Sequence, residues 1–143
     1  MLKVGLLGAG RIGQVHAAVV AAHEGSRLGA ISDVYEPAAE KLAAKYHAQV
    51  RSSDEIIADD AINAVLIATS TDTHSDLIEA ATQAGKAVMC EKPVDLSLER
   101  ARACLEAVSE TGRPVMIGFN RRFDPSFAAI RDSLAAGQIG KAE

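Results

Sequence analysis

A glycine-rich loop follows the first apolar run of this chain and constrains its fold more than any other feature. The chain continues from that run, residues 2–7, into the loop residues Gly8, Ala9, Gly10, Arg11, Ile12 and Gly13. Glycines at these spacings permit a tight turn, close approach of the backbone to a pyrophosphate, and close packing of a helix on a strand. The sequence therefore predicts a strand–loop–helix unit whose helix N-terminus binds phosphate groups.

An acidic residue, Asp33, follows Gly13 by twenty positions. It could cap the next helix, but this spacing favours hydrogen bonds to the ribose hydroxyls of a dinucleotide. Its charge would repel a 2′-phosphate, which favours NAD over NADP, and the adjacent Val34 is assigned to the same cofactor site. Arg11 is evidence against this preference for NAD, because an arginine in this loop can stack on adenine or bind a phosphate.

Short apolar runs alternate with helical patterns along the chain. The runs, nearly continuous in Val, Ile, Leu and Ala, cover residues 2–7, 28–32, 64–68, 87–90 and 115–119. Such runs are typical of parallel strands that are buried on both faces. One helix is expected over residues 38–46 with Pro37 in its first turn, and another begins after Ser97 and stops at Gly112. The alternation predicts an α/β fold, a Rossmann-type doubly wound parallel sheet in three layers.

The composition excludes several classes of protein. The net charge is −4, with no basic stripe that would favour nucleic acid, and no apolar run is long enough to cross a membrane. Cys90 and Cys104 lack the spacing of metal ligands, and we interpret them as reduced core thiols of a cytoplasmic protein. We interpret His16, His23 and His47 as surface or packing residues, and we expect no metal site.

Polar residues follow the ends of the later predicted strands, where ligands bind in open parallel sheets. They are Asp33, then Thr69, Ser70 and Thr71 with His74 beyond them, then Glu91 and Lys92, and finally Asn120, Arg121 and Arg122. The threonines and serine either satisfy backbone groups at the strand end or line the cofactor. Lys92 could be an ordinary surface charge, but the strand before it and Pro93 after it hold it at this edge. There its amine can orient an alcohol oxygen and help its proton leave.

These stretches together resemble the glucose–fructose oxidoreductase and inositol 2-dehydrogenase (Gfo/Idh/MocA) family. The resemblance covers essentially all 143 residues, and its matching stretches are GLLGAGRIGQVHA, ISDVYEPAAEKLA, IATSTDTHSDLIEAA, GKAVMCEKPVDLS, GFNRRFDPSF and AAGQIGKAE. The Glu-Lys-Pro tripeptide is the family's hallmark, and the NRRFDPSF run looks most like the inositol dehydrogenase branch.

The resemblance implies roles for individual residues. Cofactor contacts are implied for residues 8–13, Asp33, Thr69, Ser70, Thr71, His74 and Glu91. Lys92 would be catalytic and would also contact the cofactor, while Asn120 and Arg121 would lie on the nicotinamide or substrate side. The family's further aspartate and its histidine acid/base lie beyond residue 143, in a second domain that also forms the oligomer interface.

The sequence therefore predicts the NAD-binding half, residues 1–143, of an NAD-dependent inositol or sugar dehydrogenase. Its substrate would be a cyclic polyol or sugar, and its full-length parent would be a homo-oligomer. The alternative is a stand-alone dinucleotide-binding module without catalysis.

Residues 119–143 would lead into the second domain. Phe123, Phe127, Ile130 and Leu134 recur with a helical period, which predicts an amphipathic helix over residues 124–136 that stops at Gly137. This stripe could pack on the sheet like the other helices. We expect instead that it leaves apolar surface uncovered, with self-association or disorder of the final residues as the result.

Overall fold

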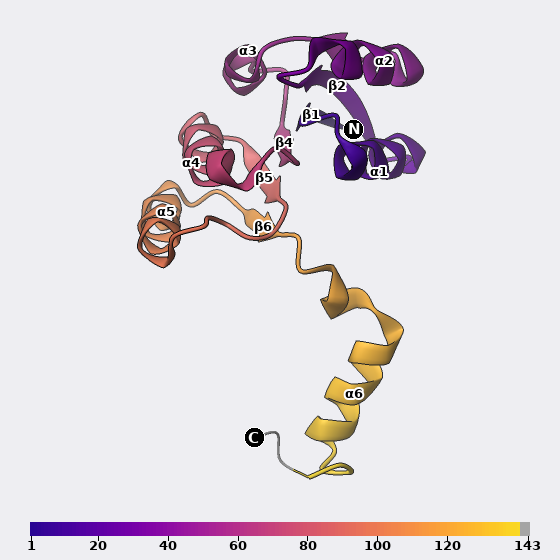
Figure 1. Ribbon diagram of the computed structural model, residues 1–143, viewed down its shortest axis with the longest axis vertical. Helices are drawn as coiled ribbons and strands as arrows, with labels where there is room; N and C mark the ends of the chain where they lie inside the picture. Colours follow the sequence, from indigo (N-terminus) through magenta and orange to yellow (C-terminus); the bar gives the residue numbers. More distant parts are fainter. Residues whose placement is uncertain (141–143) are drawn as a thin grey trace.

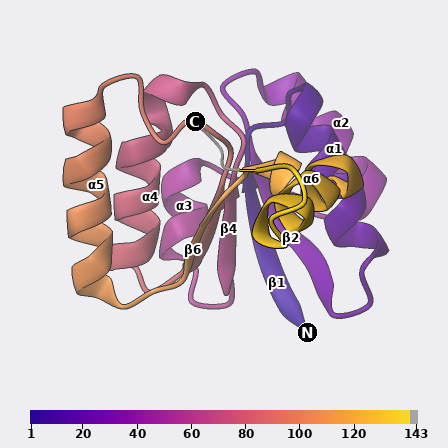
Figure 2. The ribbon, with the colours of Figure 1, turned by 90° about the horizontal axis from the view of Figure 1, so that it is seen from below.

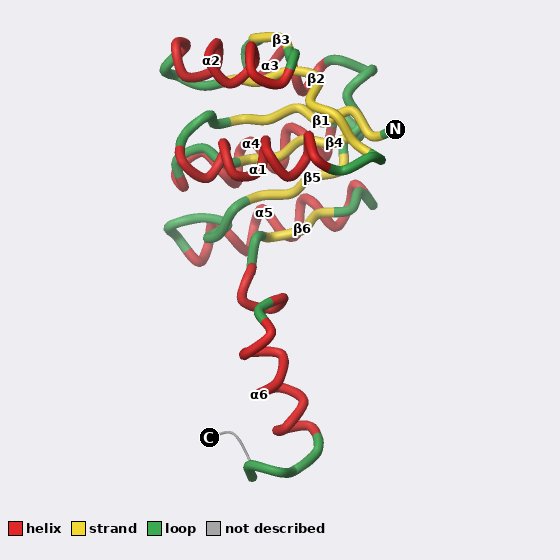
Figure 3. The backbone as a smooth tube through the Cα atoms, turned by 90° about the vertical axis from the view of Figure 1, so that its right-hand side faces the viewer, coloured by secondary structure: helices red, strands yellow, loops and turns green. Residues whose placement is uncertain are grey.

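Parallel strands form one sheet at the centre of the protein. The computed structural model describes residues 1–140. Within that range the strand order is β3-β2-β1-β4-β5-β6 (Figure 1; β3 is labelled in Figure 3). The strands are β1 (Leu2–Leu7), β2 (Ser26–Ser32), β3 (Gln49–Val50), β4 (Ala64–Ile67), β5 (Ala87–Cys90) and β6 (Val115–Ile117). β1 pairs with β2 on one side and with β4 on the other, so the strand order reverses beside β1. Open sheets bind ligands outside the carboxyl ends of the strands at such a reversal.

Helices cover both faces of this sheet. Helices α1 (Arg11–Ala22) and α2 (Glu36–Tyr46) lie on one face, and α3 (Ser53–Ala58), α4 (His74–Gln83) and α5 (Leu98–Thr111) lie on the other (Figure 2). Each face has its own core. Ile56, Ile78 and Cys104 belong to the core beneath α3, α4 and α5, whereas Ala17 and Leu42 belong to the core beneath α1 and α2. The predicted three-layer Rossmann architecture is confirmed.

The residues predicted to begin or end helices lie at those helix ends. Ser97 caps α5 by accepting a hydrogen bond from the backbone N–H of Arg100, and Gly112 ends that helix with a φ of 63°. Pro37 lies in the first turn of α2. Strand β2 begins two residues before the predicted run, and β6 ends two residues before the predicted run ends. The ends of a strand are set by hydrogen bonds to the neighbouring strand, which the pattern of apolar residues does not reveal.

Strand β3 and helix α3, between α2 and β4, were not predicted from the sequence. Strand β3 has only two residues, both exposed, so no apolar run announces it. Helix α3 does carry a local signal: Ser52 and Glu55 form a reciprocal capping box around its N-terminus. That pattern, followed by buried Ile56 and Ile57, could have identified the helix.

The last helix extends away from the layers. Helix α6 (Pro125–Ala135) begins after Asp124, which accepts hydrogen bonds from two backbone N–H groups, and Gly137 follows with a φ of 70°. No residue of α6 is buried, and Figures 1 and 3 show the helix beyond the edge of the domain. The alternative in which its apolar stripe packs on the sheet is therefore wrong. The expected disorder of the final residues concerns in part positions 141–143, which lie outside the described residues.

Candidate functional site

A cavity of about 380 Å³ opens where β1, β2 and β4 end. Its lining residues are Gly8, Gly10, Asp33, Val34, Ser53, Ala68, Thr69, Ser70, Thr73 and Leu77. The fold thus brings together the glycine loop, the acid after β2 and the polar residues after β4. Ser53, Thr73 and Leu77 are additions that the sequence analysis did not make, and Ser53 was missed because α3 was missed.

The three glycines of the loop have different surroundings. Gly8 has a φ of +99°, and a Cβ there would overlap the carbonyl of Ala68. A Cβ on Gly13 would overlap the carbonyl oxygen of Gly8, whereas a Cβ on Gly10 would meet no atom within 4 Å. The outer glycines are therefore required by the protein's own packing. The middle glycine leaves open space where α1 begins, at the position that a phosphate would approach.

Asp33 connects the end of β2 to the glycine loop. Its Oδ2 accepts a hydrogen bond from the N–H of Ala9 at 2.6 Å, and its Oδ1 accepts one from the N–H of Tyr35 at 2.8 Å. The structure gives α2 no side-chain cap, so Asp33 is not the helix cap that was the alternative. The two backbone donors orient the carboxylate before any ligand arrives. Arg11 and Ile12 are exposed in the first turn of α1, while Ala9 is buried.

The residues after β4 form a hydrogen-bonded turn. The hydroxyl groups of Thr69 and Thr73 lie 2.7 Å apart, and the Thr73 hydroxyl donates to the carbonyl oxygen of Ser70 at 2.9 Å. Thr69 and Ser70 line the cavity, whereas Thr71 starts a short 3-10 turn, Thr71–Thr73. The cluster therefore satisfies a backbone group, as one interpretation expects, and two of its members face the cavity. Contact with a cofactor stays a prediction.

His74 lies inside the protein with only 1% of its surface exposed. Its Nδ1 lies 2.7 Å from the carbonyl oxygen of Pro93, and its Nε2 lies 3.2 Å from the carbonyl oxygen of Thr69. The ring therefore tethers the turn after β4 to the loop after β5, and it is not among the residues that line the cavity. This tether differs from the direct cofactor contact that the sequence analysis expected of His74.

Lys92 lies at the other end of the carboxyl edge. It is exposed and lines a hollow of about 240 Å³ together with residues 118–122. Asn120 and Arg121 lie in the 3-10 turn Asn120–Phe123, and the guanidinium of Arg121 stacks over the ring of Phe127, 5.0 Å from its centroid. The residues that line the hollow carry one amine, one amide and two guanidinium groups, which are hydrogen-bond donors.

Glu91 has a partner that the sequence analysis did not anticipate. Its Oε1 lies 2.7 Å from Nε2 of His16, which comes from the middle of α1. The interpretation of His16 as a plain surface or packing residue is therefore wrong. His23 and His47 are exposed, as that interpretation expects.

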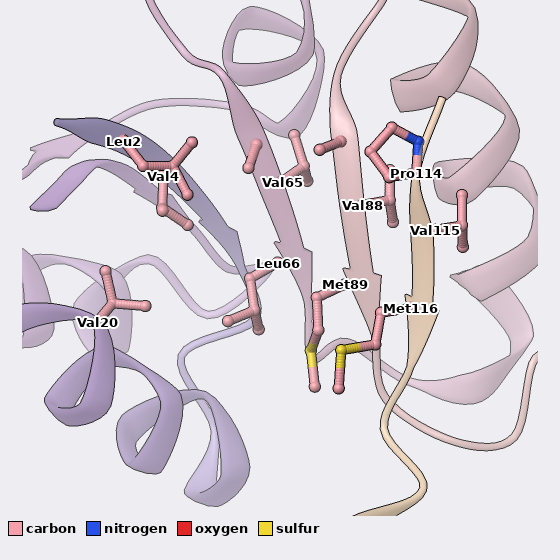
Figure 4. A pocket seen from close by; sticks show the side chains of 12 residues that line it. Leu2, Val4, Val20, Val65, Leu66, Val88, Met89, Pro114, Val115 and Met116 are labelled. Atoms are coloured by element: carbon pink, nitrogen blue, oxygen red, sulfur yellow. The ribbon is translucent and has the colours of Figure 1, made fainter. Parts of the chain in front are cut away.

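A second hollow, of about 320 Å³, is apolar and lies apart from these groups. Figure 4 shows its lining side chains, which include Val20 of α1, Leu66 of β4, Met89 of β5 and Met116 of β6. It lies on the sheet face that carries α1, at the part that α1 leaves uncovered. With no charged side chain in its lining, it offers no group that would hold a phosphate.

Neither a metal-binding cluster nor a helix that could span a membrane is found within residues 1–140. No group of three or more His, Cys, Asp or Glu residues in that range is placed to hold a metal ion. None of the helices in that range combines the length and the apolar character needed to cross a membrane.

Burial raises the pKa of the Cys90 thiol to about 12, so this cysteine at the end of β5 is a packing residue and not a nucleophile.

Comparison with known proteins matches this chain to one family. A sequence model described as an oxidoreductase family with an NAD-binding Rossmann fold, GFO_IDH_MocA, matches residues 2–119. The chain is 53% identical over 142 residues to an inositol 2-dehydrogenase from Rhizobium meliloti, covering 99% of this chain and 43% of that protein. It is 40% identical to a scyllo-inositol 2-dehydrogenase (NAD(+)) from Bacillus subtilis, covering 98% of this chain and 42% of that protein.

The structural comparison agrees with the sequence comparison. The crystal structure of scyllo-inositol dehydrogenase from Lactobacillus casei, with bound NAD(H) and scyllo-inositol, superposes with a TM-score of 0.92 at 28% identity. The match covers 98% of this chain and 42% of that one. The chain thus spans less than half the length of these relatives.

Proposed function

This chain belongs to the Gfo/Idh/MocA family of oxidoreductases, and we propose that it is the NAD-binding part of a dehydrogenase that acts on inositol or a related cyclic polyol or sugar. The observation that carries the proposal is the cavity beside the glycine loop. There a carboxylate at the end of β2 is held by the N–H of Ala9, and the space beside Gly10 is open. This arrangement suits the ribose and the pyrophosphate of NAD.

We infer the orientation of the cofactor from the strand order. Asp33 follows β2, so the adenosine half would lie on that side of β1, and the nicotinamide half would extend over the ends of β4 and β5. Thr69 and Ser70 would flank the middle of the molecule. The N-terminus of α1 would meet the pyrophosphate.

The reaction would take place in the hollow beside Lys92. When bound, NAD would accept a hydride from the carbon that carries the reacting hydroxyl. The Lys92 amine would donate a hydrogen bond to that oxygen and promote loss of its proton. Asn120 and Arg121 would bind the neighbouring hydroxyl groups, because both are exposed in the same hollow.

We place this function in the cytoplasm, since both cysteines are free and buried. Residues 1–143 would constitute one NAD-binding domain, and residues 119–143 would lead into a substrate domain. That domain would supply the histidine acid/base and the contacts between subunits of the parent enzyme.

Calorimetric titration with NAD tests the proposal. The Gly10→Val variant should bind NAD at least about 10-fold more weakly and lose only about 1 kcal/mol of its free energy of unfolding as an altered N-cap, because a Cβ at this position meets no protein atom within 4 Å. Ala21→Val, at an exposed position near the other end of α1, is the matched control. Equal NAD affinity of all three proteins would contradict the proposed site.

The alternative function is a dinucleotide-binding module without catalysis. Titrating the NAD-loaded chain with a panel of polyols separates the two functions, because the substrate hollow of a dehydrogenase beside Lys92 binds a polyol, whereas a dinucleotide-binding module does not. The exposed Lys92 and its hollow favour the dehydrogenase, since binding a dinucleotide does not need a further site for hydroxyl groups.

A further inference from the structure

A partly buried hydrogen bond joins His16, in the middle of α1, to Glu91 at the end of β5. Nε2 of His16 lies 2.7 Å from Oε1 of Glu91, and the two side chains are only 19% and 18% exposed. The partners are 75 positions apart in the sequence. A contact of this length between partly desolvated groups restrains both side chains more than an exposed pair would.

The Glu91 carboxylate has a pocket built from three elements. Its Oε2 accepts a hydrogen bond from the N–H of Lys92 at 3.3 Å. On the other side lies Gly118 at the end of β6, where a Cβ would stand 3.1 Å from Oε2 and 3.3 Å from Oε1. The absence of a side chain at position 118 therefore makes room for the carboxylate, while His16 from α1 and Lys92 from the loop after β5 hold it.

The position of this pair in the sheet suggests what it faces. Glu91 follows β5, on the opposite side of β1 from Asp33. If the proposed function holds, this is the side that receives the nicotinamide half of NAD. Nicotinamide is cationic in NAD⁺ and neutral in NADH, so a fixed carboxylate near it favours the oxidised form.

We propose that His16 is a positioning residue: it fixes the Glu91 carboxylate, and through it the backbone of Lys92, at the end of β5, where the proposed function puts the nicotinamide. The proposal rests on the proposed function, because it assigns a preference between the two redox forms of the same cofactor. His16 itself touches neither cofactor nor substrate in this scheme. Its effect is to keep one negative charge in one place.

Three ligands test the proposal by calorimetry: NAD⁺, NADH and ADP-ribose, which lacks the nicotinamide ring. His16→Ala should weaken NAD⁺ about 10-fold and NADH less, which corresponds to the loss of one charge-assisted hydrogen bond, and should leave ADP-ribose unchanged. His16→Gln keeps an N–H donor at a similar reach and should restore most of the NAD⁺ affinity. His23→Ala, at an exposed histidine at the end of the same helix, should change none of the three.

A second variant keeps the test independent of the stability of His16→Ala. Glu91→Gln keeps an oxygen that accepts from His16 but removes the charge, so it should lower the ratio of NAD⁺ to NADH affinity several-fold. Combining it with His16→Ala should lower that ratio no further, because both changes act on the same carboxylate.

The outcomes separate this inference from the proposed function. Equal weakening of NAD⁺, NADH and ADP-ribose in His16→Ala would overturn the inference, as would an unchanged NAD⁺ to NADH ratio in Glu91→Gln. A wild-type chain that binds none of the three ligands would instead contradict the proposed function itself, and with it the premise of this inference. Rescue by His16→Gln together with constant ADP-ribose affinity would support a positioning role over a merely structural one.

Discussion

The loop between β1 and α1 and the segment after β6 both lie at the carboxyl edge of the sheet, but they are held in opposite ways. In the loop, Gly8 and Gly13 leave no room for side chains, and the N–H of Ala9 is bonded to Asp33. After β6, residues 119–123 are all exposed, and α6 buries no side chain at all. We call residues 8–13 with Asp33 the closed end, because contacts within the chain hold them. We call Lys92 and the residues after β6 the open end, because their polar and apolar groups face outward.

This difference suggests a division of labour. The cavity beside the glycine loop is held by contacts within the chain before any ligand binds, which lowers the ordering cost of binding there. The Lys92 end has its lysine, amide and guanidinium groups on an open surface. We therefore expect binding of NAD and catalysis to respond differently to changes in this chain.

The largest expected effect concerns turnover. The 143-residue chain should bind NAD yet oxidise myo-inositol at a rate at least about 10²–10⁴-fold below that of a full-length relative, because a positioned general base contributes about that factor. Lost orientation of the substrate adds to this deficit. The rate of NADH formation, followed by absorbance, measures it. Robust oxidation by this chain that disappears in Lys92→Ala would show that the open end is sufficient by itself.

A substitution in the glycine loop tests the closed end. In Gly13→Ala the new Cβ overlaps the carbonyl oxygen of Gly8. The free energy of unfolding should fall by about 3 kcal/mol, the upper part of the usual range for overpacking. Gly10→Ala is the control, since its Cβ meets no protein atom within 4 Å, and it should cost no more than about 1 kcal/mol as an altered N-cap. Urea unfolding measures both, and equal losses would mean that the loop is not packed as described.

The sequence predicted the closed end better than the open end, and the reason is local. The roles of Gly8, Gly13 and Asp33 depend on spacings within one strand–loop–helix unit, which are visible in the sequence. The order of strands and the edge that carries the polar residues follow from the alternation of elements.

Contacts between distant segments could not be predicted in this way. Nothing in the sequence pairs His16 with Glu91, because the two meet only after α1 has packed on the assembled sheet. His74 is a similar case, since its burial against Pro93 depends on how two loops meet. The period of the α6 stripe predicted the helix but could not tell which surface, if any, covers it.

Removing the Asp33 carboxylate should cost less free energy of NAD binding than Gly13→Ala costs in free energy of unfolding. Asp33→Ala should weaken NAD about 10- to 100-fold, because charge-assisted hydrogen bonds to the ribose are lost, and should narrow the preference over NADP as the repulsion of a 2′-phosphate disappears. Calorimetric titration of both cofactors measures this, with the exposed Asp60→Ala as the control. If the wild-type chain bound NADP as tightly as NAD, Arg11 or another cation would override the carboxylate.

The smallest expected effect is at the open end, where apolar side chains lie in water. Phe123 is 70% exposed and Ile130 is 52% exposed, both on the segment that extends from the domain. Exposed apolar groups that gather on one element tend to find a partner, so we expect the chain to self-associate through residues 119–140. Ile130→Ser should weaken this association about fivefold, since roughly half of an isoleucine's surface is available to be buried. Leu105→Ser is the matched control, because Leu105 is 51% exposed but lies on α5, within the layers of the domain.

Sedimentation velocity over a concentration series decides this prediction. The wild-type chain and Leu105→Ser should show the same rise of the sedimentation coefficient with concentration, and Ile130→Ser should need higher concentrations to reach it. Amide hydrogen exchange in α6 should slow as the associated form accumulates, because its exposed turns become covered. A chain that stays monomeric while the amides of α6 are strongly protected would mean that the helix folds back onto its own domain. The contrast between the closed and the open end would then apply to the Lys92 hollow alone.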